Sequence, residues 1–171
     1  ILEEFFAPHA IIHGSLVDVY GVGMLYVGDS NVGKSECVLD LVESGHRMVA
    51  DDVVHISNVG RAIIGRPDPL IKHHMEIRGV GIIDVSTMYG AGAIMRSKHI
   101  DMVIHLELWQ ADKEYDRLGL TDNYIDILGV KVPSLLLPIH PGRNLAVVLE
   151  VAARNRSEEH TSELQSPIYI S

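Results

Sequence analysis

The chain has 171 residues, of which 47% are hydrophobic and 22% charged, enough for one globular domain with a sizeable core. It carries 14 Lys and Arg against 23 Asp and Glu, a formal charge of -9, which argues against a general nucleic-acid binder. Its single cysteine, Cys37, excludes an internal disulfide and is typical of a reducing cytoplasm. No apolar run reaches the roughly 18–20 residues of a membrane-spanning helix.

The first half of the chain predicts short strands and one helix. Residues 10–27 alternate apolar and polar side chains between glycine breaks, which is typical of strands joined by tight turns. A helix is expected over 35–45, where apolar residues recur on one face. Residues 47–56 form an apolar run interrupted by two carboxylates, and we predict a buried strand that ends at those acids.

The second half is less regular. Residues 61–69 contain glycine and two prolines, which predict a hairpin and turn, and 71–85 contain a Gly-Val-Gly break before an apolar run. The later elements expected are a buried strand over 101–109, a polar loop over 112–120, a strand and Pro-Gly turn over 132–144, and a terminal helix beginning within 144–155. This order of strands and helices predicts an α/β sheet domain.

Residues 156–171, RSEEHTSELQSPIYIS, differ in composition from the rest. They are polar and show no amphipathic period that continues the preceding segment. The run RSEEHTSELQS also matches the in-frame translation of a common short-read sequencing adapter. We therefore expect 156–171 to be a non-native tail in place of the natural C-terminus, the alternative being a natural charged tail. Because the chain also lacks an initiator methionine, we expect it to be a fragment.

A phosphate-binding motif occupies residues 28–35, where GDSNVGKS fits G-x-x-x-x-G-K-[ST] between an apolar strand and a helix. The backbone N–H groups of such a loop and the helix N-terminus hold a polyphosphate. Gly28 and Gly33 permit turns that a Cβ would obstruct. Lys34 is expected to reach the β- and γ-phosphates and Ser35 to hold Mg²⁺. The remaining positions of this expected cradle are Asp29, Ser30, Asn31 and Val32.

Two acids, Asp51 and Asp52, follow the loop at the end of the next predicted strand. Phosphoryl transfer needs a group that orients or deprotonates the acceptor and ligands that complete a metal site. Adjacent residues on a strand face opposite ways, so we expect only one acid to point into the site and the other to support it. The alternative is a pair of acids on a surface turn.

With the loop and the acids in place, residues 2–155 resemble the C-terminal catalytic domain of HPr kinase/phosphorylase. The resemblance rests on HGSLVDVYGVG, GDSNVGKSE, SGHRMVADD, MEIRGVGIIDV, MYGAGA, EYDRLG, ILGVKVP and PGRNLAVVLEVAA. It implies a P-loop kinase fold similar to phosphoenolpyruvate carboxykinase, with a mixed β-sheet and flanking helices. Residues 1–155 would be the catalytic domain, without the family's N-terminal domain and most of its C-terminal helix.

The family is bifunctional. It phosphorylates a serine of the phosphocarrier protein HPr with ATP or pyrophosphate, and it reverses this by phosphorolysis, in which inorganic phosphate attacks phosphoserine and pyrophosphate leaves. The resemblance therefore implies a role in carbon catabolite regulation in the bacterial cytoplasm. It also implies Mg²⁺ as the metal, HPr as the partner and a homohexamer, with no nucleic acid or membrane partner.

Individual residues acquire roles from this resemblance. Asp52 matches the catalytic acid/base, which takes the serine proton in one direction and returns it in the other. Glu76 of MEIRG matches a second magnesium ligand beside Ser35. His13 and Arg117 match further active-site positions, and Arg117 would neutralise charge on the transferring phosphoryl group. Without the family, His13 and Arg117 are ordinary packed or surface residues.

The segment PIHPGR, residues 138–143, lies where the family has a segment needed mainly for phosphorolysis. Its members are Pro138, Ile139, His140, Pro141, Gly142 and Arg143. The family pattern is close to P-V-R-P-G-R, so His140 stands where an arginine is expected. Because histidine carries little charge at neutral pH, we expect phosphorolysis that is weaker, or more dependent on acid pH, than the kinase reaction.

Two other functions stay open. A kinase for a small metabolite would need a nucleoside-specific lid, and MEIRGVGIIDV tells against it. A nucleotide-binding regulator that docks HPr without turnover is disfavoured by the intact Lys34, Asp52, Glu76 and Arg117, although the truncation keeps it open.

Overall fold

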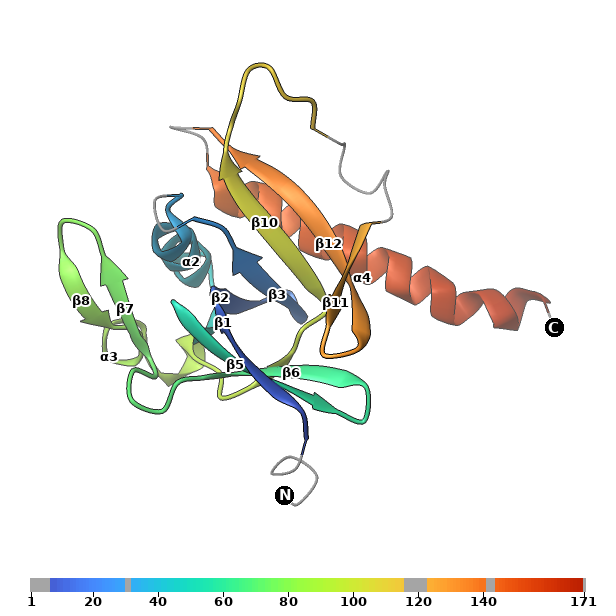
Figure 1. Ribbon diagram of the computed structural model, residues 1–171, viewed down its shortest axis with the longest axis horizontal. Helices are drawn as coiled ribbons and strands as arrows, with labels where there is room; N and C mark the ends of the chain where they lie inside the picture. The colour runs from blue at the N-terminus through green and yellow to red at the C-terminus, as the bar shows by residue number, and fades with distance from the viewer. Residues whose placement is uncertain (1–6, 30–31, 116–122, 141–143, 171) are drawn as a thin grey trace.

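The computed structural model describes residues 7–29, 32–115, 123–140 and 144–170, with side chains as far as residue 157 (Figure 1). In chain order the elements are β1 (His9–His13), β2 (Ser15–Val19), β3 (Val22–Val27), α2 (Lys34–Glu43), β4 (Arg47–Ala50), β5 (Val53–Val59), β6 (Ala62–Pro67), β7 (His74–Ile77), β8 (Gly81–Asp84), α3 (Val85–Tyr89), the 3₁₀ turn η1 (Ala91–Ala93), β9 (Lys98–His99), β10 (Met102–Leu108), β11 (Asn123–Ile127), β12 (Val130–Ile139) and α4 (Leu145–Ile170).

A six-stranded mixed sheet in the order β11-β12-β10-β3-β2-β4 forms the centre of the molecule. Strand β10 pairs in parallel with both β3 and β12, whereas β2 is antiparallel to β3 and to β4. Strands β4, β3, β10 and β12 therefore all run in one direction. Their carboxyl ends share one edge of the sheet, so the segments that follow them are neighbours in space.

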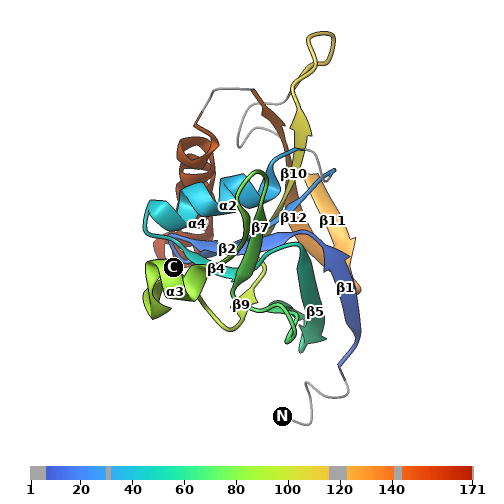
Figure 2. The same ribbon diagram turned by 90° about the vertical axis from the view of Figure 1, so that its left-hand side faces the viewer.

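The central sheet is covered on both faces. Helices α2 and α4 lie on one face, and the four-stranded antiparallel sheet β1-β5-β6-β9 lies against the other (Figure 2). Strand β3 shows why: Met24 and Tyr26 pack in the core cluster under the helices, and Leu25 packs in the cluster on the opposite side. This alternation follows from the two-residue period of a strand, which here is apolar on both faces. The expected mixed sheet with flanking helices is thus confirmed.

Helix α2 begins at Lys34 and ends at Glu43, close to the expected 35–45. Its buried residues Val38, Leu41 and Val42 lie on one face, as the apolar spacing predicts. Gly45 follows with a φ of 100°, a left-handed conformation that suits glycine after a helix end.

Helix α4 docks on the sheet through Ala146, Leu149 and Ala153, whose spacing of three and four residues forms one buried face. The Tyr20 hydroxyl also donates to Glu150 of this helix at 2.5 Å. The helix runs on through 156–170, the segment set apart as a polar tail. A helical backbone does not bear on where those residues come from, so the interpretation of the tail stays a prediction. Among the described residues, no helix is long and apolar enough to cross a membrane.

The buried strand predicted to end at the two acids is confirmed, since β4 ends at Ala50. Residues 53–59, beyond the acids, form β5 of the other sheet. The break is at Asp52, whose φ of 70° lies in the left-handed region and turns the chain from one sheet to the other. The prediction of a hairpin within 61–69 is wrong, because 62–67 form the single strand β6, which pairs with β5.

The close approach of β3 and β9 yields a test of this packing. A Cβ added at Gly23 would overlap the carbonyl oxygen of His99, whereas one added at Gly92 would meet nothing within 4 Å. We expect Gly23→Ala to lower the free energy of unfolding by about 1–3 kcal/mol or more, because backbone must move. Gly92→Ala is the matched control and should change it by less than about 0.5 kcal/mol. Urea unfolding of both variants measures the difference. Equal effects of the two substitutions would contradict the close approach of β3 to β9.

Candidate active site

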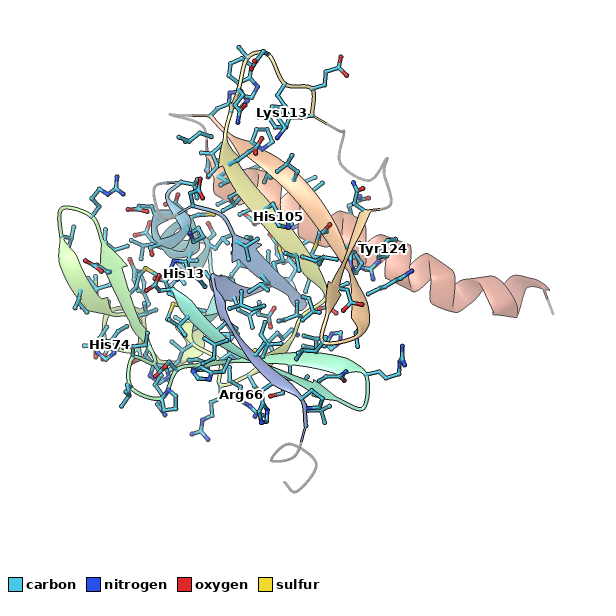
Figure 3. The ribbon with its side chains drawn as sticks, in the orientation of Figure 1. His13, Arg66, His74, His105, Lys113 and Tyr124 are labelled. Carbon is cyan, nitrogen blue, oxygen red and sulfur yellow. The ribbon has the colours of Figure 1, made fainter. Side chains whose placement is uncertain are left out.

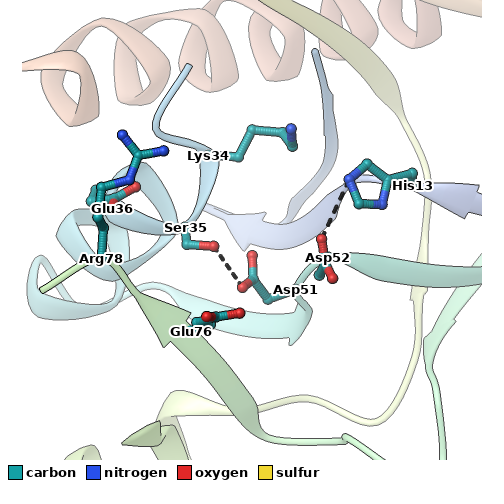
Figure 4. Close-up of a pocket in the computed structure, with 8 residues that line it drawn as sticks. All are labelled: His13, Lys34, Ser35, Glu36, Asp51, Asp52, Glu76 and Arg78. Carbon is teal, nitrogen blue, oxygen red and sulfur yellow. Dashed lines mark hydrogen bonds and ion pairs between the residues drawn. The ribbon is translucent and has the colours of Figure 1, made fainter. Parts of the chain in front are cut away.

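A pocket of about 290 Å³ opens at the carboxyl edge of the central sheet, close to the end of β1 where Figure 3 labels His13. The side chains that line it are His13, Lys34, Ser35, Glu36, Asp51, Asp52, Glu76 and Arg78 (Figure 4). They come from β1, α2, the β4–β5 connection and the β7–β8 hairpin. Tertiary folding therefore gathers six of the residues singled out from the sequence: His13, Lys34, Ser35, Asp51, Asp52 and Glu76.

The glycine-rich loop leaves β3 and enters α2. A Cβ on Gly28 would overlap the carbonyl oxygen of Leu106, so the loop lies directly against β10 and needs glycine there. Gly33, with a φ of 88°, precedes the helix and offers no side-chain cap to the first-turn N–H groups. Those N–H groups and the positive end of the helix dipole are suited to an anion.

Lys34 is buried, with 6% of its surface exposed, and its ammonium donates to the carbonyl oxygens of Gly28 at 2.7 Å and Asp29 at 3.0 Å. An ammonium has three N–H donors, so these bonds leave a third for a ligand. The lysine thus closes the loop on itself while its charge stays beside the helix N-terminus.

Asp51 is the most buried acid of the site and is held by two hydroxyls. Ser15 at the start of β2 donates to Oδ1 at 2.6 Å, and Ser35 of α2 donates to Oδ2 at 2.8 Å. Burial raises the pKa of Asp51; the two hydroxyls lower it, and the neighbouring Asp52 charge raises it. Because Ser35 uses its hydrogen on Asp51, the oxygen lone pairs of its hydroxyl are free to bind a cation.

Asp52 and His13 form the open side of the pocket. Asp52 Oδ1 lies 3.4 Å from His13 Nε2, and both side chains are more than half exposed. The pair is fixed by backbone: Gly14 N–H donates to the Asp52 carbonyl at 3.0 Å, and His13 is paired with Val53 in the β1–β5 ladder. Asp52 is thus an exposed carboxylate on a constrained turn, suited to exchange a proton with a bound molecule.

The expectation that only one of the two acids points into the site is wrong, since Asp51 and Asp52 both line the pocket. The rule of opposite faces holds for extended backbone. Here the positive φ of Asp52 rotates its side chain away from the position that a strand would give it.

Glu76 reaches the pocket from β7. Alternation along this strand buries Met75 and Ile77 and leaves Glu76 on the other face, toward Ser35 and Asp51 (Figure 4). A serine hydroxyl and two carboxylates form an all-oxygen donor set, which fits Mg²⁺. No three His, Cys, Asp or Glu side chains gather as a metal site within the described ranges.

The charge of the pocket has a chemical consequence. Four of its side chains are acidic, Glu36, Asp51, Asp52 and Glu76, against the permanent cations Lys34 and Arg78. A polyphosphate would meet net repulsion in this pocket unless a cation accompanied it. The donor set and the charge balance therefore both favour a bound divalent cation.

Several predicted residues are not part of this cluster. Arg117, Ser30, Asn31, Pro141, Gly142 and Arg143 lie outside the described residues. Gly28 and Asp29 contribute the carbonyls that hold Lys34, and Val32 is buried in the core. Pro138, Ile139 and His140 lie at the end of β12 and do not line the pocket.

Sequence reasoning missed three contributors: Ser15, Glu36 and Arg78. Each lies within two positions of a residue that was identified, in HGS, GKSE and MEIRG. Motif proximity could have suggested Glu36 and Arg78. Nothing local marks Ser15, because its role depends on β4 lying next to β2.

Comparison with known proteins gives consistent matches. The model of the HPr Serine kinase C-terminal domain family matches residues 4–166. An HPr kinase/phosphorylase from Thermoanaerobacter sp. (strain X514) is 53% identical over 159 residues, which are 92% of this chain and 52% of that protein. One from Clostridium perfringens (strain SM101 / Type A) is 50% identical over 169 residues, 99% of this chain and 55% of that protein. The chain spans about half the length of the curated relatives it matches.

Among solved structures, that of the Hpr(Ser) kinase/phosphatase from Coxiella burnetii matches with a TM-score of 0.85. The sequences are 31% identical, and the match covers 94% of this chain and 98% of that one. The fold described above is therefore shared over nearly the whole chain.

The Ser15–Asp51 bond gives a prediction with a definite pH dependence. Removing the hydroxyl in Ser15→Ala leaves a buried carboxylate with one partner fewer, so its already raised pKa rises further. A raised folded-state pKa means that ionisation costs stability as pH rises above the unfolded value of about 3.9. We expect a loss of about 1.5–3 kcal/mol in unfolding free energy at pH 7 and a smaller loss at pH 4.

Urea unfolding at both pH values measures this loss. Ser44→Ala is the control, because its hydroxyl donates to the Asp40 carbonyl at an exposed helix end. It should cost less than about 0.5 kcal/mol at either pH. A Ser15→Ala penalty that does not grow with pH would contradict a bond to an ionised Asp51.

Proposed function

This chain belongs to the HPr Serine kinase C-terminal domain family, and from that premise we propose that residues 1–155 are the catalytic domain of a bifunctional kinase/phosphorylase. It transfers a phosphoryl group from ATP or pyrophosphate to a serine of HPr, and it removes that group by phosphorolysis. The observation that carries the proposal is the single pocket shared by Lys34, Ser35, Asp52 and Glu76. That pocket combines a phosphate-binding helix end with an exposed carboxylate and oxygen ligands for a cation.

In the forward direction the amides at the start of α2 and the Lys34 ammonium bind the polyphosphate. The incoming serine hydroxyl approaches from the open side, where Asp52 is exposed. Asp52 accepts the hydroxyl proton as the serine oxygen bonds to the terminal phosphorus and the bond to the leaving phosphate oxygen breaks. His13, 3.4 Å from Asp52, keeps that carboxylate turned toward the serine.

In the reverse direction inorganic phosphate attacks phosphoserine and pyrophosphate forms. Asp52 then gives the proton to the departing serine oxygen, as microscopic reversibility requires. We assign charge neutralisation on the transferring group to Arg117. Residues 138–143 serve mainly this reverse reaction.

Ser35 and Glu76 are the residues that would hold Mg²⁺, with Asp51 orienting the Ser35 hydroxyl by accepting its hydrogen. When bound, Mg²⁺ supplies positive charge that offsets the acidic pocket and the phosphate oxygens. The backbone amides at the start of α2 and the side chains of the pocket bind the polyphosphate, orient the reacting groups and transfer the proton.

The cellular context follows from the family. We propose that the protein of which this chain is a part works in the bacterial cytoplasm, in carbon catabolite regulation. It takes HPr as its partner, assembles as a homohexamer, and has no nucleic acid or membrane partner.

Transfer of labelled phosphate tests the function directly. With labelled ATP, Mg²⁺ and HPr, we expect label on a serine of HPr. Lys34→Ala and Asp52→Asn should each lower the rate by at least about 100-fold, because they remove the phosphate-binding charge and the general base. Label on a small metabolite instead, or full activity in Asp52→Asn, would contradict the proposal.

Matched controls lie on the outer strands. Lys131→Ala removes a lysine of β12. In the wild type the Gly129 N–H donates to Asp126 Oδ1 at 3.0 Å, and Asp126→Asn keeps a side-chain oxygen that can accept this bond. Neither side chain lines the pocket, so both variants should keep the wild-type transfer rate within about twofold.

Because position 140 is a histidine, we expect the balance between HPr phosphorylation and phosphorolysis to be altered. His140→Arg restores a permanent cation in the phosphorolysis segment, so the ratio of reverse to forward rate should rise at pH 7.5. Rates of HPr phosphorylation and phosphoserine-HPr phosphorolysis in the two proteins measure this ratio. Equal reverse rates for the two proteins at pH 7.5 would refute the prediction.

A further inference from the structure

Two aromatic side chains lie together at the same sheet edge as the phosphate-binding loop. Trp109 directly follows β10 and His140 directly follows β12. Their rings stack, with centroids 5.0 Å apart and an interplanar angle of 30°. The backbone N–H of Trp109 donates to the backbone carbonyl of Ile139 at 3.0 Å, which fixes the two segments to each other. Trp109 nevertheless stays 45% exposed, so its ring is available for contact.

The strand order puts this aromatic pair on a definite side of the loop. In the order β12-β10-β3-β2-β4, the loop follows β3, the acids Asp51 and Asp52 follow β4, and the aromatic pair follows β10 and β12. A triphosphate is a linear chain whose reacting end must face Asp52. Its other end, which carries the nucleoside, therefore leaves the loop away from the acids and toward β10 and β12.

A small apolar pocket lies beside the pair. It has a volume of about 160 Å³ and is lined by Leu137, Pro138, Ile139, His140, Leu145 and Val148, from the end of β12 and the start of α4. Planar heterocycles bind in such mostly apolar pockets against aromatic walls. The imidazole of His140 is at once a wall of the pocket and half of the stacked pair.

We propose that the Trp109–His140 pair and the adjoining apolar pocket bind the base of the nucleoside triphosphate donor. This inference rests on the proposed function and extends it to donor recognition. Stacking on an aromatic face tolerates any base. The site therefore favours nucleoside triphosphates over inorganic polyphosphates.

Comparing two donors isolates the base. Pyrophosphate has no base, so removing the Trp109 ring should spare its binding. By calorimetry with Mg²⁺, we expect Trp109→Ala to weaken ATP binding about tenfold and pyrophosphate binding less than about twofold. Trp109→Phe keeps a stacking ring and should lose only about two- to threefold for ATP. Melting temperatures identify any variant that fails to fold.

Tyr124→Ala is the matched control. Tyr124 is an exposed aromatic of β11 that pairs with Pro133 of β12, seven residues before His140, and it lines neither pocket. The variant should bind both ligands like the wild type. Trp109 is also the sole tryptophan of the 171 residues, so the emission of the wild-type protein reports on it alone. Saturating ADP should change that emission.

The outcomes separate this inference from the proposed function. Selective loss of ATP binding in Trp109→Ala supports the base site. Equal loss of ATP and pyrophosphate, loss of neither, or emission insensitive to ADP overturns it. Those results would leave the kinase assignment standing, because that assignment is decided by transfer to HPr in Lys34→Ala and Asp52→Asn.

Discussion

The buried carboxylate of Asp51 is the interaction on which the site depends. Burial of a charge is costly unless polar groups surround it, and Ser15 and Ser35 donate to its two oxygens at 2.6 and 2.8 Å. These bonds join the start of β2, the end of β4 and the first turn of α2 around one group. They fix the Ser35 oxygen with its lone pairs free. Asp52, the next residue, has a left-handed backbone and lines the open pocket.

The second constraint is the common direction of four strands. Because β4, β3, β10 and β12 all end at one edge, that edge collects the acids, the glycine-rich loop and the aromatic pair in a fixed lateral order. The antiparallel β2 returns between β3 and β4 and begins at the same edge, which is why Ser15 can reach Asp51. A linear phosphate donor bound across these strands would have its reacting end beside the acids that follow β4. Its opposite end would lie beside the segments that follow β10 and β12.

Charge explains why an acidic protein can hold an anionic ligand. The overall charge of -9 argues against a nucleic-acid partner, and the pocket itself has more acids than permanent cations. One point of the pocket nevertheless suits an anion. Helix α2 begins there at Lys34, and its N-cap residue Gly33 makes no side-chain bond to the first-turn N–H groups. The surrounding carboxylates then suit a divalent cation better than a bare phosphate.

The sequence by itself determined the loop, its helix and their order, because spacing within one segment encodes a glycine turn, a lysine and an amphipathic helix. It also identified Asp52 and Glu76, through motifs that the family shares. Only the tertiary structure decided that Asp51 and Asp52 separate two sheets, since pairing of β4 with β2 and of β5 with β1 involves residues distant in the chain. The same holds for Ser15 beside Asp51 and for Trp109 on His140: local sequence carries no signal for contacts between distant segments, which exist only when the strands have found their neighbours.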